Sequence, residues 1–253
     1  MAYFQAVHRP LRFTVPPSNS ARLSNCSTCN LAELCLPVGL TDEEMQRLDE
    51  LNMQKHSYAR GDYLYRGGDK FRAVFAINRG AFKTRVLHED GREQVTGFQM
   101  AGEIIGLDAI STDIHDGEAL ALEDSVVCEL PFHRLETLSR DIPSLQRHFH
   151  KIMSREIVRD QGIMLLLGSM RSEERVAAFL LTLSQRYAAR GLSPTQFQLS
   201  MSRQDIGSYL GLKLETVSRA FSHFQEKGII AVRTRSIEIL DLALLQAGVN
   251  SSC

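Results

Sequence analysis

The segment from residue 200 to residue 240 constrains the fold more than any other part of the chain. Two helical patterns, Arg203–Leu210 and Leu214–Lys227, surround Gly211, and glycine adopts positive φ at a sharp turn without a steric penalty. Apolar residues recur where two crossed helices must bury side chains between them, at Ile206, Leu210, Leu212, Val217 and Phe221. Two short β-like runs around Thr234 predict a hairpin. The segment therefore predicts a helix-turn-helix with a β wing.

Three polar residues share one face of the second helix, because residues three and four apart are helical neighbours. Glu215, Ser218 and Arg219 lie in its first turns, which meet base edges in the major groove in such motifs. Glu215 can accept a hydrogen bond from a cytosine amino group, Arg219 can donate two to guanine, and Ser218 can serve either role. The alternative is a surface ion pair between Glu215 and Arg219 on a helical hairpin without a ligand.

The charge of this segment differs from that of the whole chain. Six cations outnumber three anions between residues 200 and 235, a net charge of +3, whereas the chain carries −1. A wholly basic nucleic-acid binder is excluded, but the segment has the local positive surface that a phosphate backbone requires. The candidates for backbone contacts are Arg203, Lys213, Arg233 and Arg235, the last two on the wing.

The stretch Ile206–Arg219 resembles the recognition segment of the FNR branch of the CRP/FNR regulators, the fumarate-and-nitrate-reduction or anaerobic regulators. The likeness extends from about residue 26 to residue 245. It implies that Glu215, Ser218 and Arg219 contact a palindromic half-site of the TTGAT type. One departure is Lys213, where the family commonly has a threonine N-cap and where a phosphate contact is the expected substitute.

Cysteines form the second constellation. Cys26, Cys29 and Cys35 lie in one short loop, and Cys128 lies on a predicted strand that would present it to that loop. The residue types leave three possibilities open: an iron–sulfur cluster, a structural zinc ion, and reduced thiols without a ligand. The set also resembles the cysteines of the FNR regulators, which implies that these four hold a [4Fe–4S] cluster. Cys253 has no counterpart in that set.

The order of patterns along the chain predicts an α+β fold. Short strands with glycine turns from about residue 57 to residue 131 indicate a β-roll, and the resemblance implies a cyclic-nucleotide-binding-like jelly roll. The predicted parts are a flexible arm over residues 1–25, a cysteine loop and β-roll over residues 26–140, a dimerisation helix over residues 141–170, and a winged helix-turn-helix over residues 171–253.

The predicted dimerisation helix carries a coiled-coil seam with steps of four and three residues. Its members are Met153, Ile157, Asp160, Met164 and Leu167. A two-fold homodimer would match a palindromic operator, and it would bring two Asp160 carboxylates together, which weakens the dimer. The alternative is that helical drift turns Asp160 outward, or that a neighbouring arginine neutralises it.

The runner-up function is a cyclic-nucleotide-responsive regulator. Ala101–Gly106 resembles the Gly-Glu segment of a phosphate-binding cassette, but neither Lys nor Arg occurs between Arg92 and Arg134, and His115 is the candidate cation there. A zinc-stabilised DNA-binding protein that senses nothing is a further alternative. We find no phosphate loop, nucleophile elbow or His-Glu metal motif, so we expect no enzyme.

The resemblance implies an oxygen-responsive activator or repressor of anaerobic-metabolism genes that works with RNA polymerase. Prolines and arginines interrupt the N-terminal stretch, so no secretory signal peptide is expected. Neither is a membrane span, because no apolar run approaches the necessary length. We therefore expect the protein to reside in the cytoplasm.

Overall fold

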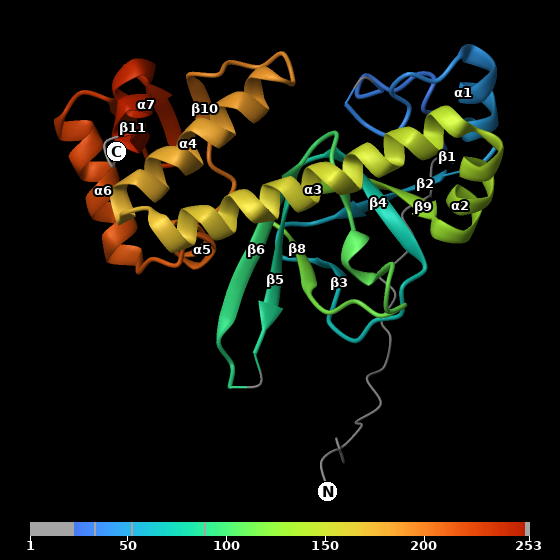
Figure 1. Cartoon of the computed structure of the whole chain (residues 1–253), viewed down its shortest axis with the longest axis horizontal. Helices are drawn as coiled ribbons and strands as arrows, with labels where there is room; N and C mark the ends of the chain where they lie inside the picture. Colours follow the sequence, from blue (N-terminus) through green and yellow to red (C-terminus); the bar gives the residue numbers. More distant parts are fainter. Residues whose placement is uncertain (1–22, 33, 52, 89, 251–253) are drawn as a thin grey trace, which may run out of the picture.

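The computed structural model describes residues 23–32, 34–51, 53–88 and 90–250, so most of the predicted arm and Cys253 lie outside the described residues. A β-roll and a winged helical domain stand at opposite ends of the long helix α3, Pro143–Ser169 (Figure 1). The predicted α+β fold, with a β-roll, a long helix and a C-terminal winged helix-turn-helix, is confirmed. No helix in the described part of the chain is long and apolar enough to span a bilayer.

Two antiparallel sheets form the β-roll, in the strand orders β1-β2-β9-β4-β7 and β3-β8-β5-β6. The strands are β1 (Leu23–Ser24), β2 (Met53–Tyr58), β3 (Tyr63–Tyr65), β4 (Ala73–Arg79), β5 (Ala81–Leu87), β6 (Glu93–Met100), β7 (Ile104–Ile105), β8 (Glu118–Ala121) and β9 (Ser125–Pro131). The short helices α1 (Asp42–Asp49), η1 (Leu107–Ala109) and α2 (Phe132–Asp141) accompany them.

Side-chain alternation along β4 separates two cores, because successive residues of a strand point to opposite faces. Val74 and Ala76 pack with the cysteine loop, α1, α2 and the first half of α3. Ile77 packs on the other side with Phe82 and Val127 of the facing strands. The β-roll therefore has one core between its sheets and another beneath α3.

The sequence of α1 explains where it begins. The Thr41 hydroxyl accepts from the backbone N–H of Glu44, and the Glu44 carboxylate accepts from the Thr41 N–H, which makes a capping box.

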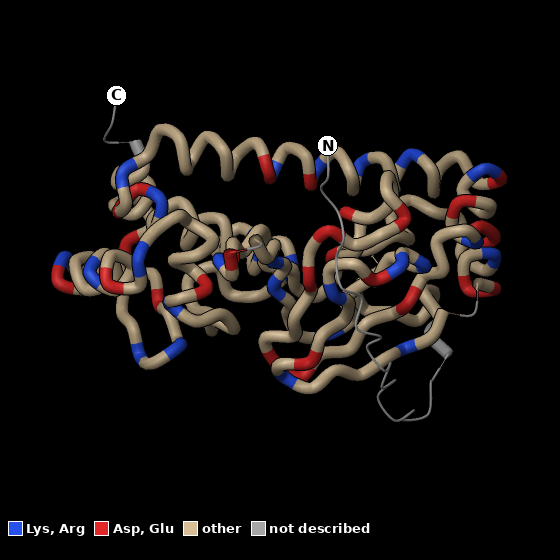
Figure 2. The backbone as a smooth tube through the Cα atoms, turned by 90° about the horizontal axis from the view of Figure 1, so that it is seen from below, with Lys and Arg blue, Asp and Glu red and all other residues tan. Residues whose placement is uncertain are grey.

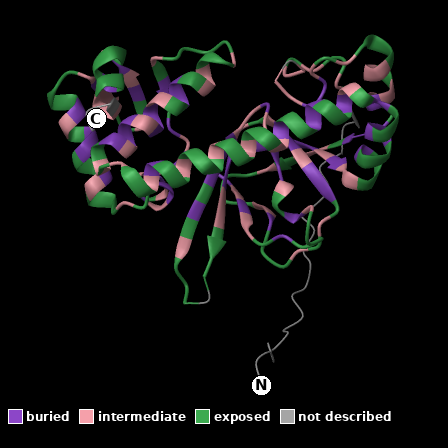
Figure 3. Cartoon of the chain, viewed as in Figure 1, coloured by how far each residue is buried: buried purple, intermediate pink, exposed green. Residues whose placement is uncertain are grey.

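Helix α3 has 27 residues and packs against both domains. Leu145, Phe149 and Ile152 bury into the core of the β-roll, whereas Leu166 joins the core of the winged domain. Much of the outer face between these contacts is exposed (Figure 3).

The winged domain contains α4 (Ser172–Ala188), β10 (Gln196–Gln198), α5 (Arg203–Leu210), α6 (Leu214–Glu226), β11 (Ile230–Arg233), β12 (Ser236–Ile239) and α7 (Leu242–Asn250). Its three strands pair in the order β10-β12-β11, which is the predicted hairpin with one added strand. Its core includes Val95 and Phe98 from β6, so the apolar interior continues from the β-roll into the winged domain.

Candidate nucleic-acid interface and cysteine cavity

Helices α5 and α6 form the predicted helix-turn-helix. The Ser202 side chain caps α5 by accepting from the Asp205 N–H, and Gly211 ends the helix with φ 63° and ψ 36°. Ile206, Val217 and Phe221 are at most 3% exposed between the helices. The burial pattern predicted from the sequence is confirmed at these positions.

Glu215, Ser218 and Arg219 are all exposed on α6. No ion pair joins Glu215 to Arg219 among the described side chains, so both head groups stay available to a partner. Lys213 is the N-cap residue of α6 and makes no capping hydrogen bond through its side chain, in line with the departure at this position. The three predicted base-contacting side chains thus lie on one open surface.

The remaining residues predicted to contact phosphate differ in exposure and in the contacts they already make within the chain. Arg233 is exposed on the wing, whereas Arg235 is partly buried and donates to the Ser200 carbonyl over 3.1 Å. Arg203 lies with its guanidinium carbon 3.2 Å from the centre of the Phe221 ring, and burial lowers its pKa to about 10. Arg203 therefore stacks between α5 and α6, a structural role that the sequence did not reveal. Its DNA contact stays a prediction.

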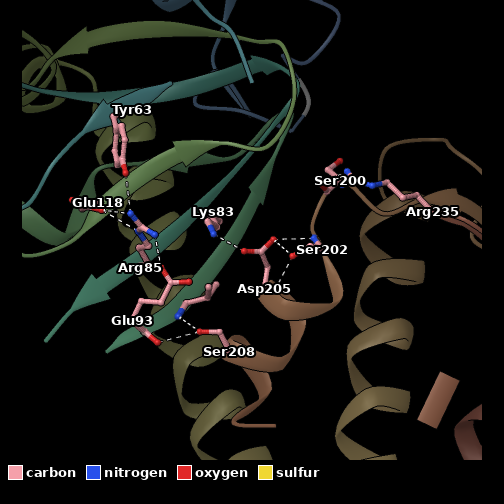
Figure 4. Close-up of polar contacts among 11 residues, drawn as sticks. Tyr63, Lys83, Arg85, Glu93, Glu118, Ser200, Ser202, Asp205, Ser208 and Arg235 are labelled. Carbon is pink, nitrogen blue, oxygen red and sulfur yellow. Dashed lines mark hydrogen bonds and ion pairs between the residues drawn. The ribbon is translucent and has the colours of Figure 1, made fainter. Parts of the chain in front are cut away.

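The helix-turn-helix docks on the hairpin of β5 and β6 (Figure 4). Lys83 of β5 forms a largely buried ion pair with Asp205, the residue that also completes the α5 capping box. The Ser208 hydroxyl accepts from the Val95 N–H over 2.9 Å. The Asp205 pKa lies below its ordinary value because hydrogen bonds from Lys83 and Ser202 outweigh the opposing effect of burial.

Glu103, between β6 and β7, forms a second connection to the winged domain. Its carboxylate pairs with Arg186 of α4 over 2.6 Å and with Arg190 over 2.7 Å. Burial raises the Glu103 pKa, but these two guanidinium groups outweigh burial, so the pKa lies below the ordinary value. This glutamate belongs to the segment Ala101–Gly106, which resembles part of a nucleotide cassette. In the structure it takes part in an ion network between domains.

All four predicted ligand cysteines line one cavity. Cys26, Cys29 and Cys35 come from the loop, and Cys128 comes from β9, where it shares a core with Leu130. The free space that a water-sized sphere can reach in this cavity is about 20 Å³, so the lining side chains nearly fill it. Its other lining residues are Leu31, Ala32, Leu36, Pro37, Met53, Ala76, Ile77, Asn78 and Leu130.

Polar contacts hold the cysteine loop on both sides. The Asp49 carboxylate at the end of α1 accepts from the Cys26 N–H and from the Ser27 hydroxyl. Asn78 of β4 donates its side-chain N–H to the Cys29 sulfur over 3.7 Å. These contacts fix the loop to the β-roll.

Burial disfavours the thiolate form of these cysteines. It raises the Cys35 pKa to about 12, and the nearby Cys128 and Cys29 add to the shift. The Cys26 pKa is also raised well above its usual range, first by burial and then by Cys35 and Asp49. These thiols stay protonated near neutral pH unless a metal supplies compensating positive charge.

The loop also contacts elements that lead away from the β-roll. A Cβ atom at Gly102 would lie 2.9 Å from the Leu34 Cβ, so this loop residue packs on the turn that carries Glu103. On another side, His148 of α3 lies against the Cys35 backbone, and Leu36 is 1% exposed in the core shared with α3. The cysteine loop therefore touches both the long helix and the interdomain ion network.

A separate cavity of about 510 Å³ lies between the β-roll and α3. Its charged lining residues are Asp108, Asp116, Glu118, Glu156, Arg159 and Asp160. Arg159, the single lysine or arginine among its described lining residues, is already paired with Glu156. His115 is 3% exposed and stacks on Tyr65 with ring centroids 3.8 Å apart. This carboxylate-rich wall would repel a cyclic phosphate.

The long helix exposes an apolar surface. Ile157, Val158, Met164 and Leu165 are 58%, 63%, 64% and 65% exposed. The half of α3 nearer the winged domain carries no charged residue after Asp160 (Figure 2). Asp160 is also exposed. Of the predicted seam, Ile157, Asp160 and Met164 are thus open to a partner.

The other two seam residues lie partly within the chain itself. Met153 packs against the β-roll core and Leu167 against the winged-domain core. The seam as a whole stays a prediction.

Comparisons with known proteins agree with both halves of the architecture. Residues 174–247 match the model of the Crp-like helix-turn-helix domain, and residues 55–141 match that of the cyclic nucleotide-binding domain. The solved structure of FixK2 from Bradyrhizobium japonicum is 31% identical with a TM-score of 0.73, and the match covers 79% of this chain and 99% of that chain.

Two curated relatives extend the likeness over most of the chain. The transcriptional activator protein anr of Pseudomonas aeruginosa is 47% identical over 218 residues, which cover 86% of this chain and 89% of the relative. The fumarate and nitrate reduction regulatory protein of Escherichia coli is 43% identical over 215 residues, which cover 85% and 86%. The expectation of a transcription regulator rather than an enzyme is confirmed by these relatives.

Proposed function

Because the chain belongs to the FNR type of the CRP/FNR transcription regulators, we propose that it binds palindromic DNA as a homodimer and regulates genes of anaerobic metabolism in response to oxygen. The proposal includes TTGAT-type half-sites and a [4Fe–4S] cluster held by Cys26, Cys29, Cys35 and Cys128. It places the protein in the cytoplasm, where it activates or represses transcription together with RNA polymerase. The observation that carries the sensor part is the convergence of four cysteines on one cavity.

The open face of α6 supports sequence-specific binding. Glu215, Ser218 and Arg219 are exposed and adjacent, and the docked α5 holds α6 from behind. Arg219 can donate to guanine and Glu215 can accept from cytosine in the major groove. Arg233 on the exposed wing can contact phosphate and thereby fix the register.

The cysteine cavity suits a cluster better than a single ion. No group of three or more His, Cys, Asp or Glu side chains in the described part of the chain is arranged to hold one metal ion, as a structural zinc site would require. Iron–sulfur clusters are held by four cysteine thiolates, and four cysteines line this cavity. Thiolates are the ligands that iron–sulfur clusters use, and the apolar wall limits the access of water.

The chain offers two routes from the cavity to the DNA-binding domain. His148 and Leu36 connect the loop with the half of α3 nearer the β-roll, and Leu34 packs on Gly102 next to Glu103. When bound, the cluster supplies a redox centre that dioxygen oxidises. A change at the four cysteines would alter the packing of Leu36 and His148 on α3, and it would thereby weaken the dimer and its hold on DNA.

The exposed strip on α3 supports the dimer. Ile157, Val158, Met164 and Leu165 form an apolar strip that a second copy would bury, at about 25 cal/mol per Å² of apolar area. Asp160 interrupts this strip with a charge, which makes association weaker and therefore open to control.

The experiment is anaerobic purification followed by iron and sulfide analysis of the wild type, Cys128→Ser and Cys253→Ser. We expect about four irons and four sulfides per chain in the wild type and in Cys253→Ser, and none in Cys128→Ser, because a hydroxyl is a poor ligand for this metal. A colourless wild type that contains zinc would overturn the sensor part and leave the DNA-binding part standing.

A further inference from the structure

Asn78 makes the contact from the β-roll sheet to a cysteine sulfur. Its side-chain nitrogen lies 3.7 Å from the Cys29 Sγ, although 49 residues separate the two along the chain. The alternation of β4 directs Val74 and Ala76 into the core that contains the cysteines, and Ala76 pairs with Cys128 in register on β9. The register of β4 and β9 then shifts between Ile77 and Arg79, so Asn78 lies at an irregularity of the kind that redirects a side chain.

The surroundings increase the importance of this hydrogen bond. Apart from the four cysteines, the described residues that line the cavity are Leu, Ala, Pro, Met and Ile, and Asn78 alone carries an amide. A hydrogen bond to a charged acceptor is stronger when few competing dipoles and little water surround it. The amide of Asn78 thus supplies polar stabilisation that the apolar wall lacks.

We propose that Asn78 is a positioning and tuning residue that donates a hydrogen bond to the Cys29 ligand sulfur and thereby sets the oxygen sensitivity of the cluster. This inference rests on the proposed function. A donor to a ligand sulfur stabilises the more negatively charged, reduced state, so it raises the reduction potential. A cluster with a higher potential gives electrons to dioxygen less readily.

The competing role is packing, in which Asn78 only holds the loop in place. Two substitutions separate the roles. Asn78→Leu keeps a similar volume and removes the donor, whereas Asn78→Asp keeps the shape and replaces the N–H group by an acceptor. The matched control is Gln54→Leu, which removes an exposed amide from β2, on the other side of β9 in the same sheet.

Three measurements on anaerobically purified full-length protein test the proposal: iron and sulfide content, the reduction potential by spectroelectrochemical titration, and the rate at which the visible absorbance of the cluster decays at a fixed dioxygen concentration. We expect Asn78→Leu to retain its cluster, to have a more negative potential, and to decay about two- to tenfold faster, the range of one hydrogen bond. Asn78→Asp should shift further in the same direction, because it adds negative charge. Gln54→Leu should match the wild type.

The outcomes distinguish the failure of each idea. A wild type without iron and sulfide would defeat the proposed function itself. A wild type with a normal cluster, together with an Asn78→Leu variant of unchanged potential and decay rate, would overturn the role of Asn78 alone. If Asn78→Leu does not retain a cluster, the reduction potential of Asn78→Asp becomes the test. A potential equal to that of the wild type would then overturn the proposal.

Discussion

Replacing Glu103 by glutamine should loosen the winged domain from the β-roll. The glutamine keeps the shape of the side chain but removes the negative charge that Arg186 and Arg190 face. The three side chains are 20%, 18% and 10% exposed, so they are mostly removed from water. Breaking a fully buried pair costs about 3–5 kcal/mol, and the residual hydration and the amide oxygen of glutamine reduce this to about 1–3 kcal/mol.

Hydrogen exchange near neutral pH measures this opening. Amides at the end of α4 and in the turn before β7 should exchange about 5- to 150-fold faster in Glu103→Gln, the factor that corresponds to this free energy. The matched control is Glu118→Gln, which breaks the 2.9 Å pair with Arg85 inside the β-roll. Glu118→Gln should speed exchange in β5 and β8 and leave α4 unchanged.

The pH dependence gives an independent check. The Glu103 pKa is lower in the folded state than in the unfolded state. Its stabilisation is therefore complete above the ordinary pKa of about 4.3 and is lost as pH falls through the lower folded value. The difference in unfolding free energy between wild type and Glu103→Gln should shrink in that acidic range. Exchange at the end of α4 that is the same in both proteins would refute the coupling argument.

Other substitutions test the remaining parts of the molecule. Arg219→Ala should lose about 1–3 kcal/mol at one base pair of the operator and relax discrimination there, whereas Arg233→Ala should weaken all sequences alike and flatten the salt dependence; competition binding with specific and random DNA checks both. Asp160→Ala should raise the dimer fraction in air by removing a like-charge contact, and sedimentation identical to the wild type would contradict this. Adding cyclic AMP should leave DNA binding unchanged, because the carboxylate-rich cavity offers no free arginine or lysine among its described lining residues, and a change in operator affinity would reopen the nucleotide alternative.

The sequence predicts the elements whose cause is local. The turn at Gly211 and the exposed face of Arg219 depend on residues within a few positions of each other, and the structure has both. Cys128 was grouped with the loop cysteines because the four together resemble the cysteine set of the FNR regulators. The structure places all four around one cavity, which is consistent with that grouping.

Contacts between distant segments could not be predicted in the same way. The pairs Lys83–Asp205 and Glu103–Arg190 join residues 122 and 87 positions apart, and each side chain alone has the pattern of an ordinary surface charge. Asn78 interrupts an apolar strand, which was a usable indication of a polar partner on the buried face. The stacking of Arg203 on Phe221 depends on how two helices cross, so its charge alone suggested a phosphate contact.

The docking of α5 on the β5–β6 hairpin limits how evolution and protein engineering can recombine this chain. The ring centroids of Phe98 in the hairpin and Tyr209 in α5 lie 5.1 Å apart. Lys83 forms an ion pair with Asp205, which also caps α5 within the winged domain. A chimera that joins this β-roll to the winged domain of another regulator keeps Phe98 and Lys83 but loses their partners Tyr209 and Asp205. It should fold cooperatively when the grafted domain brings an acid and an aromatic residue at the corresponding positions. Otherwise the graft should behave as two tethered domains with separate melting transitions.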